Sequence, residues 1–174
     1  MIKNELIGQR IILRKLRLKD AQVMYESWAT DPEVTKYMSW NPHQSIEETK
    51  NLLTHWIEED ELYSPIRYGI VLKSNNELVG TIDAIERGRG SDLVLGYCLT
   101  RKYWNQGLMT EAVKLLIAYL KRLGFNKLMV DAAVPNIGSN RVIKKCGGVF
   151  IKEEQRSYCN DTKTLVLNCY EINF

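Results

Sequence analysis

One segment near the middle of the chain indicates how the rest is organised: Tyr103-Trp104-Asn105-Gln106-Gly107-Leu108-Met109-Thr110-Glu111-Ala112. A run that predicts a strand, 93–99, comes before it, and a periodicity that predicts a helix, 109–123, follows it. A loop that enters a helix through a glycine leaves backbone N–H groups without helical partners, at the positive end of the helix dipole. Such a helix start suits a phosphate or pyrophosphate, so the segment predicts a nucleotide-type cofactor.

The residues after this segment predict a strand–helix–strand crossover. Apolar residues recur on one face of the predicted helix, namely Val113, Leu116, Ile117 and Leu120. Gly124 is typical of a helix C-terminus, and a helix between two strands favours a right-handed parallel connection. The remaining elements are a strand over 127–134, a short helix over 137–146 that ends at Gly147-Gly148, and strands over 149–153 and 165–172.

Helix-start and turn signals divide the first half of the chain. Asp20 and Asp31-Pro32 place an aspartate at the N-cap, and Ser45-Ile46-Glu47-Glu48 fits a capping box. Apolar residues share the inner faces of the helices that follow: Met24, Trp28, Leu53, Trp56 and Ile57. The other expected elements are strands over 10–16, 68–73 and 78–85, a hairpin turn over 74–77 and a turn over 87–92. The whole pattern predicts one α+β domain over 1–174, built on a mixed sheet.

Composition is that of a globular protein, with 45% hydrophobic and 26% charged residues among 174. The formal net charge of +3 is too small to indicate a nucleic-acid partner, although it is compatible with an anionic cofactor. No apolar run is long enough to cross a bilayer, so no membrane partner is expected. The first residues lack the features of a signal peptide, which predicts a cytoplasmic protein.

Cysteine and histidine spacing predicts no metal site. Four cysteines are scattered without a CxxC pair: Cys98, Cys146, Cys159 and Cys169. In a cytoplasmic protein this favours reduced, structural thiols over the alternative of a disulfide framework. His43 and His55 have no partner at a spacing typical of zinc ligands.

Three motifs follow one another along nearly the whole chain: Arg10-Ile11-Ile12-Leu13-Arg14-Lys15-Leu16 with Asp20 beyond it, Leu95-Gly96-Tyr97-Cys98-Leu99 with the 103–112 segment, and Pro135-Asn136-Ile137-Gly138-Ser139-Asn140-Arg141-Val142-Ile143-Lys144-Lys145-Cys146-Gly147. In this order they resemble the GNAT superfamily of acetyl-CoA-dependent N-acetyltransferases. The closest resemblance is to its RimJ/RimL-like branch, which acetylates the N-termini of ribosomal proteins. The resemblance implies a GNAT-like fold, a largely antiparallel mixed sheet with a central parallel strand pair and flanking helices, and acetyl-CoA as cosubstrate.

Three features depart from the pattern of that superfamily. Trp104 takes the first place of the loop motif, where glutamine or arginine is usual, and the RimJ/RimL-like branch tolerates this. Met109 stands where alanine or glycine is typical, so its side chain either crowds the phosphates or points into the core. Gly148-Val149-Phe150 delays the aromatic residue that usually follows Gly147. None of these departures removes a backbone donor.

The resemblance implies a set of cofactor contacts. Backbone N–H groups of the loop and helix start would bind the pyrophosphate: Gln106, Gly107, Leu108, Met109 and Thr110. The strand residues Cys98, Leu99 and Thr100 would run beside the pantetheine arm, where the strand splays from its parallel neighbour, and an N–H near Cys98 or Leu99 would hold the acetyl oxygen. Asn136 would bond the arm, or serve as a helix N-cap, or do both. Lys144 and Lys145 reach the outer phosphate or face solvent.

The catalytic groups are less defined. By resemblance Ser139 donates a proton to the leaving sulfur; the alternatives are a helix-start serine that contacts backbone, or the same role for Tyr97 or Tyr158. The general base is a carboxylate or a water relay, and four carboxylates are candidates: Asp83, Glu86, Asp131 and Glu111.

The acceptor is expected to be a primary amine. Aromatic residues gather in the N-terminal half, Trp28, Tyr37, Trp40 and Trp56, with Trp56 expected in the core and Trp40 partly exposed. The N-terminal α-amine of a protein, such as a ribosomal protein, is preferred over a small amine such as a polyamine or an aminoglycoside. A non-catalytic acyl-CoA-binding module is the alternative from another class. The sequence leaves the oligomeric state open, a homodimer included.

Overall fold

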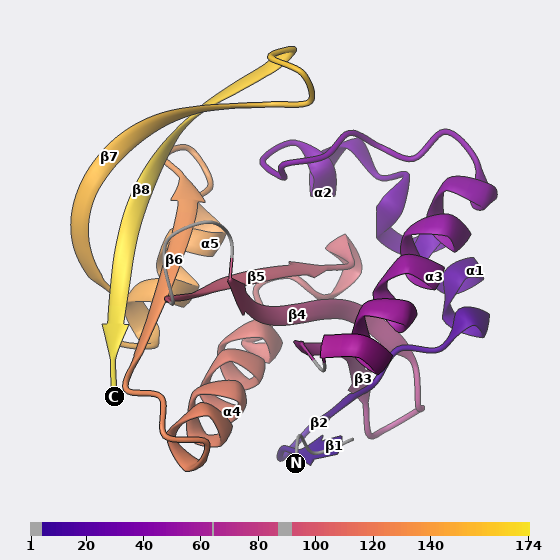
Figure 1. Cartoon of the computed structure of the whole chain (residues 1–174), viewed down its shortest axis with the longest axis horizontal. Helices are drawn as coiled ribbons and strands as arrows, with labels where there is room; N and C mark the ends of the chain where they lie inside the picture. The colour runs from indigo at the N-terminus through magenta and orange to yellow at the C-terminus, as the bar shows by residue number, and fades with distance from the viewer. Residues whose placement is uncertain (1–4, 64, 87–91) are drawn as a thin grey trace.

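The structure, a computed structural model, describes residues 5–63, 65–86 and 92–174. Within them eight strands form one sheet in the order β1-β2-β3-β4-β5-β6-β8-β7 (Figure 1). The strands are β1 (Glu5–Ile7), β2 (Ile11–Arg14), β3 (Ile66–Leu72), β4 (Leu78–Glu86), β5 (Leu93–Leu99), β6 (Lys127–Ala133), β7 (Val149–Tyr158) and β8 (Lys163–Asn173). All neighbours are antiparallel except the central pair β5 and β6, which are parallel. This confirms the predicted fold class. The turn expected over 87–92 lies, apart from its last residue, outside the described residues.

Helices cover both faces of the sheet. They are α1 (Ala21–Met24), α2 (Pro32–Thr35), α3 (Ile46–Tyr63), α4 (Leu108–Arg122) and α5 (Ile137–Lys145), with short turns η1 (Leu18–Asp20), η2 (Tyr25–Ala29, a π turn) and η3 (Arg101–Tyr103). Leu116 and Leu120 of α4 pack in one core cluster with Ile70 of β3. The next strand residue, Val71, belongs to a second cluster with Trp28 and Leu53. Because neighbouring strand residues point to opposite faces, α4 covers one face and α1 to α3 cover the other.

Most helix-start signals are confirmed in position. Asp31 caps α2 by accepting from Glu33 N–H at 2.9 Å, and Ser45 Oγ accepts from Glu48 N–H at 3.3 Å at the start of α3. Asp20 is a correction, because its side chain does not cap α1. It lies in η1 and accepts from Arg17 N–H at 2.8 Å and from the Arg14 guanidinium at 2.7 and 2.9 Å. A buried carboxylate beside a guanidinium is held by the ion pair and is not available as a cap.

The last two strands are longer than the sequence predicted. β7 was expected over 149–153 and extends to Tyr158, and β8 begins at Lys163 instead of 165. β7 is an edge strand of the sheet, and all of its side chains are exposed or half-buried. The β7–β8 hairpin extends past the sheet, and its tip arches toward α2 (Figure 1). Within the described residues, no helix is both long and apolar enough to cross a membrane.

Candidate active site

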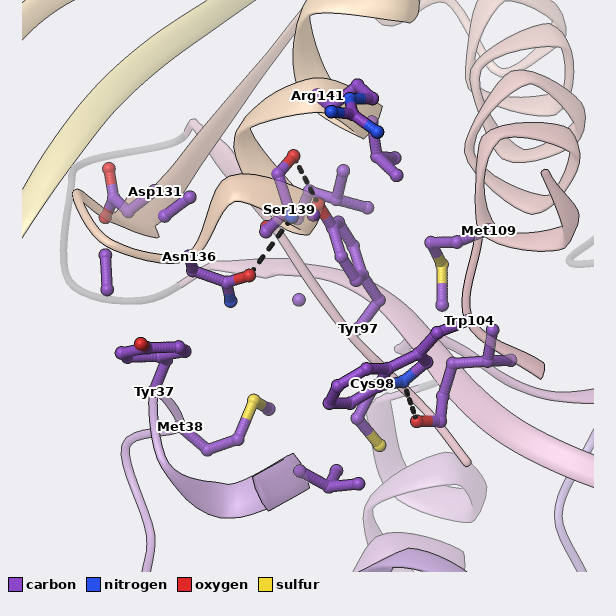
Figure 2. A pocket seen from close by; sticks show the side chains of 18 of the residues that line it. Tyr37, Met38, Tyr97, Cys98, Trp104, Met109, Asp131, Asn136, Ser139 and Arg141 are labelled. Carbon is purple, nitrogen blue, oxygen red and sulfur yellow. Dashed lines mark hydrogen bonds between the residues drawn. The ribbon is translucent and has the colours of Figure 1, made fainter. Parts of the chain in front are cut away.

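A cavity of about 810 Å³ lies where β5 and β6 diverge (Figure 2). In the described residues the two strands pair at Val94–Met129 and Leu95–Val130 and at no later position. Beyond these pairs, residues 96–99 line one wall of the cavity and residues 131–133 line the other. The splay implied by the family resemblance is therefore present, and it leaves one side of each strand available to a ligand.

The register with β4 fixes which backbone groups of β5 face this opening. Thr100 N–H donates to the Val79 carbonyl at 2.8 Å. Partners alternate along an antiparallel pair, so Cys98 also directs its N–H toward β4, whereas Leu99 directs its N–H to the opposite side. The Leu99 carbonyl, on that same side, accepts from Trp104 Nε1 at 2.7 Å. Of the two candidates for holding the acetyl oxygen, Leu99 thus has the better-placed N–H.

The loop before α4 has the properties of an anion site. Asn105 and Gly107 both have left-handed backbones, with φ of 60° and 76°. An added Cβ at Gly107 would meet only Arg10 Nη2, at 3.5 Å, so the backbone conformation and not crowding calls for glycine. No side chain in the described residues caps this helix, so its first-turn N–H groups, from Leu108 onward, are donors at the positive end of the dipole.

Arg10, which the sequence placed only in the first strand, holds this loop. Its Nη1 donates to the Gln106 carbonyl at 2.9 Å, and its Nε pairs with Glu111 Oε2 at 2.8 Å. Burial alone would raise the pKa of Glu111, but hydrogen bonds from Arg10 outweigh it and lower that pKa. Glu111 is therefore committed to positioning the loop, which weakens its candidacy as a base.

The predicted loop residues do not all face the cavity. Gly107, Leu108, Met109 and Thr110 line it, whereas Gln106 and Thr100 do not. The Met109 side chain is 6% exposed and packs in the core cluster around α4. The side chain thus packs in the core and also lines the cavity, so the structure does not decide between the two alternatives for this departure.

A hydroxyl pair joins the two walls of the splay. Ser139, in the first turn of α5, has its Oγ 2.7 Å from the hydroxyl of Tyr97 on β5 (Figure 2). The Ser139 N–H donates to Asn136 Oδ1 at 3.1 Å, so Asn136 is the N-cap and the serine hydroxyl is not used as one. Burial raises the pKa of Tyr97, and the Ser139 hydrogen bond offsets only part of that rise. The phenol therefore stays protonated at physiological pH.

Cys98, next to Tyr97 in the sequence, is not an activated thiol. It is buried, and its Sγ is 3.3 Å from Thr81 Oγ1. Burial raises its pKa to about 11. A nucleophilic cysteine requires the thiolate, so this environment opposes covalent catalysis. All four cysteines are free.

The end of the cavity that the family resemblance assigns to the acceptor has one wall from the N-terminal half. Tyr37, Met38 and Ser39, just after α2, line the cavity. Trp40 is half-exposed, as expected, and its ring centroid lies 5.4 Å from that of His43. Trp28 is core, and Trp56 is half-buried against the second cluster, with the Arg67 guanidinium 4.6 Å from its ring centroid. Of the four predicted aromatics, Tyr37 is the one that lines the cavity.

The opposite wall carries a charge cluster from β6 and β7. Arg156 Nη1 pairs with Asp131 Oδ2 at 2.9 Å, and its Nη2 pairs with Glu154 Oε1 at 2.8 Å. Hydrogen bonds from Lys152 and Arg156 lower the pKa of Glu154 to about 2. Among the four carboxylates proposed as bases, Asp131 lines the cavity, whereas Asp83 and Glu86 do not. The structure describes no group of three or more metal-ligating side chains.

Two cations line the cavity on the side of α5. They are Arg141, which sequence reasoning missed, and Lys145, whereas Lys144 lies outside the lining. Arg10 and Arg141 lie within motifs of the sequence, but neither motif indicates where the side chain lies. Arg156 pairs with Glu154 on the same strand and with Asp131 on β6, and no sequence spacing identified that cluster.

Comparisons with known proteins identify the family. The family model "Acetyltransferase (GNAT) domain" matches residues 10–149. An uncharacterized N-acetyltransferase, p20 of Bacillus licheniformis, is 33% identical over 145 residues, which are 79% of this chain and 78% of that protein.

Solved structures agree on the fold. The microcin C7 self-immunity acetyltransferase MccE, in complex with acetyl-CoA and AMP, has a TM-score of 0.82 at 19% identity, covering 96% of this chain and 94% of its own. RimL, a ribosomal L7/L12 α-N-protein acetyltransferase in complex with coenzyme A, has a TM-score of 0.82 at 18% identity over 98% of both chains. At these identities the likeness shows the fold alone. The family model spans most of the sequence, and so the chain belongs to the GNAT acetyltransferases and is an acyltransferase that uses acetyl-CoA.

Proposed function

We propose that this protein moves the acetyl group of acetyl-CoA directly to a primary amine, and that its acceptor is the N-terminal α-amine of a protein, such as a ribosomal protein, in the cytoplasm. The observation that carries the proposal is the Ser139–Tyr97 hydroxyl pair, which spans the splay at 2.7 Å in the cavity that Leu99 also lines. RimL, by its name an α-N-protein acetyltransferase, supports this acceptor class through a shared fold.

The cofactor would lie along the splay. Backbone N–H groups of Gly107 to Thr110 would bind its pyrophosphate, with Arg141 and Lys145 as nearby cations for phosphate. The Asn136 side-chain amide would bond the pantetheine arm, since only its Oδ1 is used to cap α5. The cofactor supplies an activated thioester.

The residues around the thioester have separate tasks. Leu99 N–H would donate to the carbonyl oxygen as that oxygen gains negative charge. When the amine attacks the carbonyl carbon and the C–S bond breaks, the electron pair stays on sulfur, and Ser139 would donate a proton to it and regain one from solvent. Tyr97 would orient the serine hydroxyl, and the N-terminus of α5 would favour the negative sulfur. No acetyl-enzyme is needed, in keeping with the protonated state of Cys98.

The titration behaviour of the cavity favours an α-amine. The displaced pKa values in its lining lie far from neutrality, with Glu154 at about 2 and Cys98 at about 11, and no histidine lines it. An α-amine has a pKa of about 7.7–8.0 and is partly neutral at physiological pH, whereas an alkyl amine near 10.4 is almost wholly protonated. An acceptor that supplies its own neutral amine needs little help from a base. Asp131, through a water, would take the proton released after attack.

Charge pairing argues against a polycation. A cleft for a polyamine or an aminoglycoside would present carboxylates without cationic partners, whereas Arg156 pairs with both Asp131 and Glu154 here. The net effect is a wall that tolerates one ammonium and gives little attraction to several.

The test is an acceptor panel. Wild-type protein with acetyl-CoA is assayed for thiol release on short peptides with free N-termini, on the same peptides with blocked N-termini, and on a polyamine and an aminoglycoside. We expect turnover on free N-termini, with the acetyl group located on the α-amine by mass spectrometry. Turnover confined to the polyamine or aminoglycoside would refute the acceptor, and thiol release without an acetylated amine would refute direct transfer.

A further inference from the structure

Lys163 connects the two walls of the acceptor end. This residue begins β8, just past the tip of the β7–β8 hairpin. Its ammonium donates to three backbone carbonyls in and after α2: Thr35 at 3.0 Å, Met38 at 3.1 Å and Trp40 at 3.0 Å. An ammonium has three N–H donors, so this set of carbonyls uses all of them. We call these contacts the Lys163 link.

The tip of the β7–β8 hairpin has an unusual backbone conformation. Cys159, Asn160 and Asp161 have left-handed backbones in succession, with φ of 54°, 53° and 64°. Such conformations are unfavourable for residues with a Cβ and persist where surrounding contacts hold them. One of those contacts is again to the α2 side, because Cys159 Sγ donates to the Ser39 carbonyl at 3.5 Å.

The two segments joined by the link line the same cavity from different sides. Tyr37, Met38 and Ser39 lie within the segment whose carbonyls Lys163 binds. Glu154, Arg156 and Tyr158 lie on β7, the other strand of the Lys163 hairpin. The segment after α2 has no regular structure, so its position over the cavity depends on contacts of this kind.

We propose that Lys163 is a positioning residue that fixes the separation of these two walls and thereby sets the affinity for the acceptor. This inference rests on the proposed function, because it assumes that the amine enters between the walls. The phosphate loop and α4 lie outside the link, so binding of acetyl-CoA should be insensitive to it.

The test compares three variants. Lys163→Met keeps the apolar stem and removes the donors, and Lys163→Arg restores donors. Lys127→Met is the control, since Lys127 is the first residue of β6 and pairs with Asp92 and Glu171, away from the Lys163 link. Each is examined for acetyl-CoA affinity by calorimetry, for steady-state kinetics on the best peptide acceptor, and for hydrogen exchange of residues 35–44. Lys163→Met should raise the acceptor KM at least tenfold with kcat changed less than threefold, leave acetyl-CoA affinity within twofold, and speed exchange in 35–44. Lys163→Arg should recover part of the KM, and Lys127→Met should resemble the wild type.

Each contrary result has a distinct meaning. Unchanged exchange over 35–44 in Lys163→Met would show that the link does not hold this wall, which overturns the inference even if no acceptor is turned over. Faster exchange with an unchanged acceptor KM would overturn the positioning role. If the wild type acetylates no amine, the proposed function fails on its own account, and the positioning role falls with it.

Discussion

Replacing the Ser139 hydroxyl isolates the proposed proton donor. Ser139→Ala keeps the backbone N–H that Asn136 caps, so the start of α5 should remain intact. The variant loses the 2.7 Å contact with Tyr97 and the donor for the leaving sulfur. A hydrogen bond to a charged group contributes about 1.5–3 kcal/mol, so kcat should fall roughly ten- to a hundredfold. The KM for acetyl-CoA should change much less, because sulfur carries full charge only near the transition state.

Replacing the hydroxyl of Tyr97 tests the other member of the same pair. Tyr97→Phe removes the orienting hydroxyl and leaves the serine donor, so kcat should fall less than in Ser139→Ala. If the two hydroxyls act as one unit, the double variant should be about as slow as Ser139→Ala alone. Ser157→Ala is the matched control, because its hydroxyl pairs with that of Thr164 at 3.3 Å outside the cavity lining.

Steady-state kinetics at saturating acceptor, calorimetry with acetyl-CoA and a thermal melt separate the outcomes. A purely structural role predicts a stability loss of about 1 kcal/mol with kcat nearly intact. That result for Ser139→Ala would refute the donor assignment. Fully multiplicative effects of the two substitutions would refute the claim that the hydroxyls act together.

Substitutions at three further positions and one titration test the rest of the site. Gly107→Asp should weaken acetyl-CoA binding at least tenfold, about 1.4 kcal/mol by calorimetry, because a carboxylate would stand beside the anion. Gly107→Ala should lose less affinity. Equal affinity for acetyl-CoA in the wild type and both variants would refute the assignment of the pyrophosphate to this loop. Arg10→Met should weaken acetyl-CoA binding several-fold with acceptor KM unchanged, and a rise confined to acceptor KM would contradict its role in holding the loop. Mass spectrometry after incubation with acetyl-CoA alone should show no acetyl group on Cys98, and Cys98→Ala should retain activity; a stoichiometric adduct would overturn direct transfer. The kcat/KM for a peptide should rise with pH to a plateau above about pH 8, following the pKa of the acceptor's own α-amine, and a limb near pH 6 that does not move with the acceptor would indicate an enzyme base instead.

The elements that carry the proposed cofactor site could be predicted from sequence because each of them is a contiguous segment. The strand over 93–99 and the parallel partner at 127–133 agree with the sequence to within a residue. Gly107 and Gly124, which stand just before and just after α4, both have the positive φ that these positions imply. Each of these signals comes from local backbone geometry, which is encoded within a few residues of chain.

The acceptor half could not be predicted in the same way. The stretch Glu153-Glu154-Gln155-Arg156 has no alternation of apolar residues, since β7 is an edge strand with no buried face to mark it. Asp20 was misread because its partner Arg14 belongs to a strand and competes for the carboxylate. Ion pairs and lysine–carbonyl contacts impose no periodicity, so the roles of Arg156 and Lys163 emerge only from three-dimensional proximity.

Acceptor choice can vary among proteins that share this fold, because the two halves of the site depend on different kinds of groups. The donors proposed for acetyl-CoA are backbone N–H groups around Leu99 and Gly107, which survive most side-chain changes. The walls proposed for the acceptor depend instead on side chains such as Tyr37, Glu154 and Arg156, and on how the hairpin meets the segment after α2. Substitutions there alter the acceptor cleft without disturbing the cofactor loop. Proteins as different in name as RimL and MccE can therefore share this fold at a TM-score of 0.82, and the acceptor has to be argued from these walls.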